Sequence, residues 1–546
     1  MKIKKQPILF IVLFTLCSSF IKAQNYTDAF NEIIKKELEH QSPGGSVLVS
    51  KKGSVIYNYH YGKANLELDV TTSSKSVYRI ASLSKQFTAI AILKLAEEQK
   101  LSLEDDIKKY LPDYPTQDKT ITLEHLLSHT SGIKDYLNIE SFNKAFQRQD
   151  MSPKELIDFF KNQPMDFEPG SKYQYSSSGY IILGHIIEVI SGISYEDYMK
   201  ETIFKPIGLN NTFYDNTETL IKNRVSGYKN RNGVYENIDF LSMTLPYAAG
   251  SLASTTENLF KWNEALKSEK IIASKSLSKA YTAFKLNSGK SGLQGYGWEI
   301  GNVQGIKAVK HSGGINGFIT YVLSVPEKDI YVAILTNSEN TNNLGQITSK
   351  LAAIALDNPY KLISKDIPKS QIEALNGIYE NNDGVQKTIR FEDGSLLLFD
   401  RGKTKNKLIP FKKNNFFLEN SLTTFSIKEE NDTLQLVENN TYQITTWKRI
   451  DKEVKSFKAK KVRLSELKKY QGKYELGPEF YFEVKIENNK LIGQIRADKK
   501  ELVPIGNNQF IARDIDAKLT FNLDENQKVI SLTLDQGREM AAKKIY

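Results

Sequence analysis

The stretch VYRIASLSKQFTAI, residues 77–90, decides the fold, because it joins a short extended run to the start of a helix. From there on no proline or glycine intervenes, and apolar residues recur at helical spacing: Phe87, Ile90, Leu93 and Ala96. Ser82 is expected at the N-terminal end of this helix. Free backbone N–H groups and the positive end of the helix dipole stabilise developing negative charge there.

Lys85 follows Ser82 by three residues, so its amine lies one helical turn along and can reach the Ser82 hydroxyl. A lysine in a desolvating cleft can lose its proton and serve as the base for a serine nucleophile. The Ser-x-x-Lys spacing alone is not specific, because a serine N-cap followed by a solvated lysine gives it too. The chain repeats it at 141–144, 276–279 and 465–468. The other motifs of the chain therefore decide its meaning.

Two further segments offer what a serine hydrolase needs besides a nucleophile and a base. The run FEPGSKYQYSSSGY, residues 167–180, places Tyr175 in a serine-rich loop just before an apolar helix. The run KHSGG, residues 310–314, has two adjacent glycines, which let the backbone of a strand approach a ligand closely. Together with Ser82 and Lys85, these segments form a candidate catalytic site.

The combined motifs resemble those of the serine β-lactamase and penicillin-binding-protein superfamily, specifically its class C-like hydrolase branch, over residues 30–360. The matching motifs are SLSK at 82–85, YSS at 175–177, and HSG at 311–313 in place of Lys-Thr-Gly. Secondary landmarks agree as well: HLLSHTSG at 125–132, Tyr228 after Gly227, and AGSL at 249–252.

The resemblance implies a role for each candidate residue. Ser82 would be acylated by the substrate carbonyl, and Lys85 and Tyr175 would share the proton transfers, with Tyr175 returning a proton to the leaving group. The backbone N–H groups of Ser82 and Gly314 would form the oxyanion hole. The remaining site residues implied are His311 as a catalytic residue, and Ser177 and Gly313 in substrate binding. No cofactor and no metal is implied.

Two positions depart from the pattern of the family. The usual Tyr-x-Asn is here Tyr175-Ser176-Ser177, so a short hydroxyl replaces the amide that would hold a substrate amide. His311 replaces a lysine, which removes a permanent positive charge from the substrate carboxylate. Both changes predict poor β-lactamase activity. They also leave a Ser–His pair open as an alternative mechanism.

His125 and His129 lie four residues apart, a spacing that could hold a metal ion. The sequence shows no third cluster of ligands for such a site. We therefore interpret both histidines as helix-packing residues.

The hydrolase region, residues 24–362, is predicted to be an α/β (α+β) domain whose antiparallel sheet is flanked by helices. Strands are expected at both of its ends and a mostly helical segment over 140–270 in between. The predicted helices outside that segment are 26–41, 82–96, 103–111, 121–132 and 343–357; the predicted strands are 44–49, 54–59, 308–310, 320–323 and 330–335.

The last third of the chain repeats itself. The segment NGIYE at 376–380 recurs as QGKYE at 471–475, and KRI at 448–450 recurs as KKI at 543–545. Short β-like runs separated by turn residues fill each copy, which predicts two small all-β barrels, 366–450 and 464–546, joined by the lysine-rich segment 451–463. They resemble lipocalin-like domains appended to this branch. The sequence does not assign their role or the oligomeric state.

Residues 1–23 have the features of a secretory signal peptide, with lysines around the apolar core ILFIVLF at 8–14. Its removal takes the formal charge from +10 to +6, and no basic cluster with interleaved aromatic residues suggests nucleic acid. The single cysteine, Cys17, lies inside this signal, and the bulky Leu16 before it does not favour lipid anchoring. We expect an exported, periplasmic or secreted protein.

The first hypothesis is an exported serine hydrolase that cleaves an ester or an amide of a small-molecule or peptide substrate, in the manner of a D-aminopeptidase, carboxypeptidase or esterase. The alternative is a catalytically weak wall- or ligand-binding protein on the same scaffold. A decayed scaffold should have lost at least one catalytic residue, whereas Ser82, Lys85, Tyr175 and the strand from His311 to Gly314 are all present. The sequence therefore favours the enzyme.

Overall fold

The computed structural model describes residues 26–545 except 217, 393, 401–404, 431–432, 453–458, 478–479, 497, 513–516 and 536–538. The chain divides into two compact units, residues 1–360 and 361–546. The predicted signal peptide and Cys17 lie outside the described residues. Within those residues no single helix has the length and apolar character to cross a membrane; one bent pair, Ser177–Ser191 with Tyr195–Ile207, meets these two criteria jointly.

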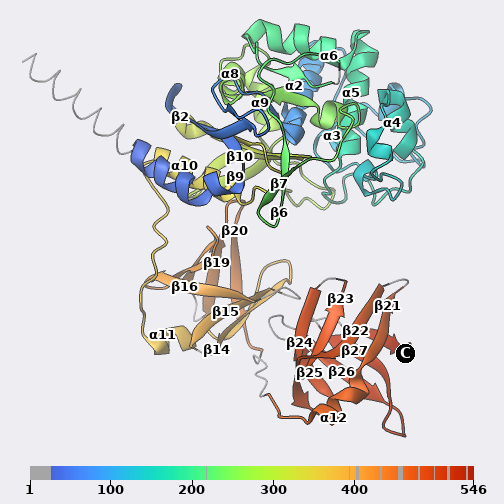
Figure 1. Ribbon diagram of the computed structural model, residues 1–546, viewed down its shortest axis with the longest axis vertical. Helices are drawn as coiled ribbons and strands as arrows, with labels where there is room; N and C mark the ends of the chain where they lie inside the picture. The colour runs from blue at the N-terminus through green and yellow to red at the C-terminus, as the bar shows by residue number, and fades with distance from the viewer. Residues whose placement is uncertain are drawn as a thin grey trace, which may run out of the picture. The chain divides into compact units, whose positions relative to one another are not determined.

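A seven-stranded antiparallel sheet forms the centre of the first unit, in the order β3-β2-β1-β12-β11-β10-β9 (Figure 1). Strand β1 pairs with β12, so that Gly45 lies opposite Thr336 and the two ends of the unit meet in one sheet. The predicted assembly of the sheet from distant parts of the chain is confirmed. The strands are β1 (Gly44–Lys51), β2 (Ser54–Asn65), β3 (Val70–Thr71), β9 (Glu299–Val303), β10 (Ile306–Ile315), β11 (Phe318–Val325) and β12 (Ile330–Thr336).

Helices cover both faces of this sheet (Figure 1). On one face, the helix over residues 26–37 and α10 (Leu344–Ala355) share one apolar cluster with the strands. On the other face lies a larger cluster that includes α2 (Ser84–Glu97), α5 (Ser177–Ser191) and α8 (Thr256–Lys267). Helices α10 and α8 pack directly on strands of the sheet, and α5 packs on α2 within the larger cluster, as expected for a layered domain.

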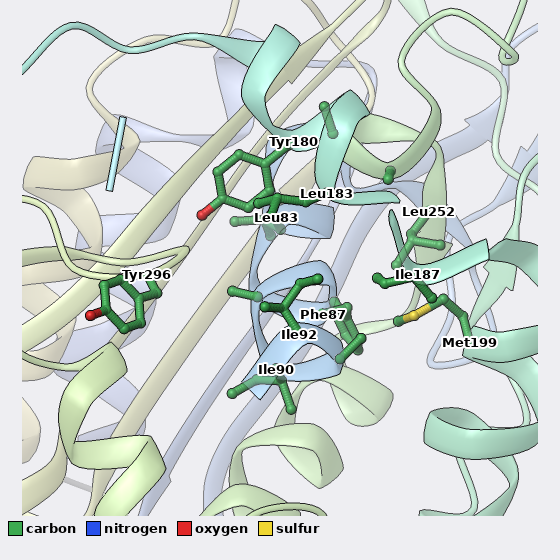
Figure 2. Close-up of a cluster of buried hydrophobic side chains, with 14 of the residues drawn as sticks. Leu83, Phe87, Ile90, Ile92, Tyr180, Leu183, Ile187, Met199, Leu252 and Tyr296 are labelled. Carbon is green, nitrogen blue, oxygen red and sulfur yellow. The ribbon is translucent and has the colours of Figure 1, made fainter. Parts of the chain in front are cut away.

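Helix α2 is the centre of the larger core, and Figure 2 shows apolar side chains around it. The predicted residues Phe87, Ile90 and Leu93 are buried, and so is Ile92 on the other side of the helix. A helix that is apolar all round belongs inside a protein. The ring of Phe87 stacks on Trp262 of α8 with 4.1 Å between centroids. This packing fixes the helix that carries Lys85.

The segment 140–270 contains fewer helical residues than predicted. Its elements include one hairpin, residues 228–237, and two short strands, residues 213–214 and 252–254, that pair with each other. The remaining elements of this unit are α3 (Leu123–Leu127), α4 (Pro153–Phe160), α6 (Tyr195–Tyr198), α7 (Tyr247–Gly250), α9 (Ser274–Ala280), β4 (Tyr78–Arg79), β5 (Phe213–Tyr214), β6 (Tyr228–Arg231), β7 (Val234–Asn237) and β8 (Leu252–Ser254).

The predicted helix over 103–111 is wrong. Only Ile107–Lys109 forms a single 3₁₀ turn, which the side chain of Asp106 caps. The backbone around it bonds instead to Ile121 and to the first turn of α3: Ile107 donates to Ile121 across 2.9 Å, and Glu124 donates to Leu103. These tertiary hydrogen bonds replace the ones that a helix would have made.

Two closed eight-stranded barrels make up the second unit, which confirms the predicted all-β repeats. The first barrel contains β13 (Gly377–Glu380), β14 (Gln386–Glu392), β15 (Ser395–Asp400), β16 (Asn406–Lys412), β17 (Asn415–Leu418), β18 (Thr424–Glu430), β19 (Thr433–Asn439) and β20 (Ile444–Ile450). The second contains β21 (Gly472–Gly477), β22 (Phe480–Glu487), β23 (Lys490–Ile495), β24 (Asp498–Gly506), β25 (Gln509–Ala512), β26 (Lys518–Leu523), β27 (Val529–Asp535) and β28 (Glu539–Lys544).

The two barrels repeat an interaction as well as a sequence pattern. The buried hydroxyl of Tyr379 donates to the carbonyl oxygen of Leu375 across 2.9 Å. The equivalent Tyr474 is buried too and donates to the carbonyl oxygen of Tyr470 across 2.7 Å. In each barrel a short helix, α11 (Lys369–Glu373) or α12 (Leu464–Leu467), precedes this tyrosine.

Candidate active site

Ser82 lies in a 3₁₀ turn, Ala81–Leu83, between β4 and α2. Ala81 has a left-handed backbone (φ 48°), which is costly for a residue with a Cβ and turns the chain sharply before Ser82. Ser84 holds this turn, because its hydroxyl donates to the carbonyl oxygen of Ala81 and accepts from the N–H of Leu252 in β8. Ser82 thus stands at the start of α2, as predicted.

Strands β10 and β11 pack against the same turn. The hydroxyl of Thr320 donates to the carbonyl oxygen of Ile80 across 3.1 Å. A Cβ at Gly313 would lie 2.3 Å from that carbonyl oxygen and equally close to the Thr320 hydroxyl. Only a glycine therefore allows β10 to approach the turn that carries Ser82.

Lys85 is fully buried, and its amine donates to two oxygens. The hydroxyl of Ser82 lies 3.2 Å from the Lys85 Nζ, and the carbonyl oxygen of Ala249 lies 2.9 Å from it. Burial lowers the pKa of the Lys85 amine to about 7, although the carboxyl group of Asp135 opposes part of this shift. Near neutral pH, a large fraction of Lys85 is therefore the free base.

Tyr175 lies against this amine, in the loop before α5. The Lys85 Nζ is 4.9 Å from the centroid of the Tyr175 ring. Burial raises the pKa of the Tyr175 phenol, and a hydrogen bond with the Ser82 hydroxyl opposes part of that shift. Because its pKa is raised, the phenol is protonated at neutral pH and can donate a proton.

His311 on β10 is buried, with its ring centroid 6.3 Å from that of Tyr175. Its Nδ1 donates to the carbonyl oxygen of Ser312 across 2.6 Å, which leaves the lone pair on Nε2. Among the described residues, Nε2 has no hydrogen-bond partner. Burial and the nearby Lys85 lower the pKa of His311 to about 4, so its ring is neutral at pH 7.

A cavity of about 250 Å³ opens beside Ser82. Gly314, Ser177 and Lys85 line it with Ser82, whereas Tyr175, His311 and Gly313 are not among its lining residues. Lys85 is the one charged residue among the lining residues that the structure describes. The other lining residues are neutral: Ala81, Tyr136, Leu137, Phe142, Gln147, Leu241, Pro246, Ala249, Gly250, Ile315 and Asn316.

Two residues of the site were not recognised from the sequence. His129, interpreted as helix packing, is buried against Tyr175 with their ring centroids 4.4 Å apart. Asp135 is buried near Lys85 and accepts from the N–H of Leu137. The sequence signal for His129 was the HLLSHTSG landmark, which ends three residues before Asp135. By contrast, His125 completes a capping box with Thr122 at the start of α3, so it does have a structural role.

The arrangement contains the parts of an acyl-transfer site. The Ser82 hydroxyl contacts the buried amine of Lys85, which can lose its proton, and the protonated phenol of Tyr175 lies beside that amine. A cavity lined by uncharged residues apart from Lys85 opens at the hydroxyl. Such groups can carry nucleophilic attack, proton transfer and leaving-group protonation.

Comparisons with known proteins identify relatives in sequence and in fold. A family model described as Beta-lactamase matches residues 30–357. Penicillin-binding protein 4* of Bacillus subtilis (strain 168) is 29% identical over 405 residues, covering 68% of this chain and 87% of that protein. The octameric penicillin-binding protein homologue from Pyrococcus abyssi superposes with a TM-score of 0.56 and 27% identity, covering 77% of this chain and 99% of the other. D-amino acid amidase from Ochrobactrum anthropi SV3 shares the fold, with a TM-score of 0.54, 21% identity, and coverage of 61% and 99%.

Proposed function

Because the chain belongs to the beta-lactamase family, we propose that it is an exported serine hydrolase that cleaves an ester or amide through an acyl-enzyme on Ser82. The observation that carries the proposal is the contact of the Ser82 hydroxyl with the buried Lys85 amine. The basic and apolar sequence of residues 1–23 supports export.

In the acylation step, the Ser82 oxygen attacks the substrate carbonyl and its proton passes to the free amine of Lys85. The backbone N–H groups of Ser82 and Gly314, which both line the cavity, would stabilise the oxyanion. The protonated phenol of Tyr175 then donates its proton to the leaving group, and Lys85 returns a proton to Tyr175. Water attacks the ester of Ser82 in the second half-reaction, which releases the acid and restores the serine hydroxyl.

The cavity supports a substrate that is uncharged next to the scissile bond. Apolar side chains of Leu137, Phe142 and Leu241 alternate with the neutral polar groups of Gln147 and Asn316. No permanently charged cation lines the described part of the cavity, because a large fraction of Lys85 is the free base, so a substrate carboxylate would find no dedicated partner. We therefore favour short acyl esters, and amides or peptides with neutral ends, over carboxypeptidase substrates.

The test is a fluorophosphonate probe followed by intact-mass measurement. The wild-type chain should gain the mass of one probe, and Ser82→Ala should gain none. Ser276→Ala is the matched control, because Ser276 lies on α9 in another Ser-x-x-Lys match and should label normally. Hydrolysis of p-nitrophenyl acetate and butyrate then measures turnover. A wild-type chain that folds but neither labels nor turns over these esters would instead favour the binding-protein alternative.

A further inference from the structure

His129 holds the chain on both sides of Tyr175. Its carbonyl oxygen accepts from the N–H of Gln174 across 3.0 Å. Its Nδ1 lies 3.1 Å from both the N–H and the carbonyl oxygen of Ser176, so either neutral tautomer makes a hydrogen bond there. One residue thus anchors the two backbone neighbours of the phenol.

The imidazole of His129 also holds the ring of Tyr175. The two rings stack with centroids 4.4 Å apart and an interplanar angle of 26°. His129 itself is 2% exposed and also contacts the ring of Tyr180, whose hydroxyl donates to the carbonyl oxygen of Leu127. The imidazole that stacks on Tyr175 is therefore itself packed against a hydrogen-bonded tyrosine.

The backbone of His129 is specialised for this position. Its left-handed φ of 57° ends α3 and turns the imidazole toward Tyr175. Histidine and asparagine adopt this conformation more readily than other residues with bulky side chains. Burial, Lys85 and His311 all lower the pKa of His129, so its ring adds no positive charge beside the phenol.

We propose that His129 is a positioning residue for the reaction, which fixes the loop and ring of Tyr175 so that its phenol stays on the Ser82 hydroxyl. This inference rests on the proposed function, since it assigns His129 to the proton transfers of Tyr175. A positioning residue should act only through the group it positions.

A double-mutant cycle with Tyr175→Phe tests this, using p-nitrophenyl butyrate. Misplacing a catalytic group by about 1 Å can cost ~10²-fold, so His129→Ala should lower kcat by ~10- to 100-fold with little change in KM. In the Tyr175→Phe background the same substitution should change kcat less than about twofold, because no phenol remains to be positioned. An equal loss in both backgrounds would overturn the proposal.

His129→Asn is the conservative variant. Asparagine tolerates the left-handed backbone, and its amide can donate to or accept from Ser176, although it cannot stack. It should recover most of the kcat lost in His129→Ala, and it serves in the cycle if His129→Ala does not fold. His125→Ala is the matched control: it removes the α3 capping box without touching Tyr175, so it should lower the melting temperature and leave kcat unchanged.

A readout without turnover separates this inference from the proposed function. The 28 tyrosines of the chain are replaced by 3-fluorotyrosine, and ¹⁹F spectra are recorded. The resonance that disappears in Tyr175→Phe is assigned to Tyr175. In His129→Ala this resonance should move or split, while His125→Ala leaves it in place. If the wild type fails to label at Ser82, the proposed function fails, yet a shifted resonance still supports the positioning. An unchanged resonance in His129→Ala overturns the inference even in an active enzyme.

Discussion

The amine of Lys85 donates a hydrogen bond to the hydroxyl of Ser82 across 3.2 Å, one helical turn apart at the buried end of α2. A lysine in water would be charged at neutral pH and could not accept a proton. Here the protein removes water from the amine and supplies only Ala249 and Ser82 as hydrogen-bond acceptors among the described residues. The same burial that lowers the pKa of Lys85 thus makes it a base.

Substitution of Lys85 or Tyr175 should slow turnover without removing the nucleophile. Lys85→Ala and Tyr175→Phe should each lower kcat for p-nitrophenyl butyrate by ~10²- to 10⁴-fold, the range for loss of general acid–base help. Their double mutant should lose less than the product of the two factors, because the two groups act as one unit. His311→Ala should mainly raise KM and still label at Ser82. Lost labelling in His311→Ala with intact turnover in Lys85→Ala would instead assign the chemistry to a Ser–His pair.

The pH profile of kcat/KM should rise to a plateau with an apparent pKa of about 7, the pKa of Lys85 in the folded protein. The rate increases with pH because the free amine is the base. His311, with a pKa of about 4, and Tyr175, whose pKa is raised, titrate outside this limb. Asp135→Asn removes a charge that raises the pKa of Lys85, so the limb should move to lower pH. A rise centred near the ordinary lysine pKa would contradict this assignment.

Alanine at the two adjacent glycines of β10 should have unequal consequences for stability. A Cβ at Gly313 would overlap the Ile80 carbonyl oxygen and the Thr320 hydroxyl at 2.3 Å, whereas one at Gly314 meets only Ile319 at 3.4 Å. Overpacking of this kind costs about 1–3 kcal/mol or more, so Gly313→Ala should lower the free energy of unfolding and Gly314→Ala should barely change it. Denaturant unfolding of the two variants measures this, and equal losses would mean that the turn does not depend on the close approach.

The wild-type chain should hydrolyse a chromogenic cephalosporin poorly, and Ser177→Asn should improve it. The longer amide would extend from the start of α5 into the cavity that Ser177 lines, and could bond to the lactam side-chain amide. One hydrogen bond contributes about 0.5–1.5 kcal/mol, so kcat/KM should rise by roughly 2- to 10-fold. Ser191→Asn, at the far end of the same helix, is the control and should change nothing. Efficient wild-type turnover would refute the role assigned to Ser177.

The sequence predicted the parts of the site that depend on local geometry. Ser82 and Lys85 lie three residues apart on one turn, so helix spacing alone predicts their contact. The assembly of one sheet from both ends of the unit followed from the strand patterns at those ends. The specific pairing of β1 with β12 is a finding of the structure. The tandem barrels followed from a repeated pattern that includes Tyr379 and Tyr474.

The contributions of His129 and Asp135 depend on tertiary structure and could not be read from spacing. His129 has a left-handed backbone just after α3, and this conformation directs its ring toward Tyr175, in a loop far along the chain. The helix expected at 103–111 failed for a related reason: its backbone groups bond to Ile121 and Glu124, which local propensity does not register.

Closure gives each barrel a folding problem that an open sheet would not have. The ring is complete only when the first strand meets the eighth, as Ile378 meets Ile450 and Tyr474 meets Lys544. Such non-local pairing is slow, and until it forms both strands present unpaired edges. Two copies in one chain could therefore exchange their eighth strands. The sizes of the interior side chains disfavour the exchange, because the buried Trp447 of one copy corresponds to the buried Ala542 of the other. After an exchange of these strands, Trp447 would overpack the second barrel, and Ala542 would leave a cavity in the first.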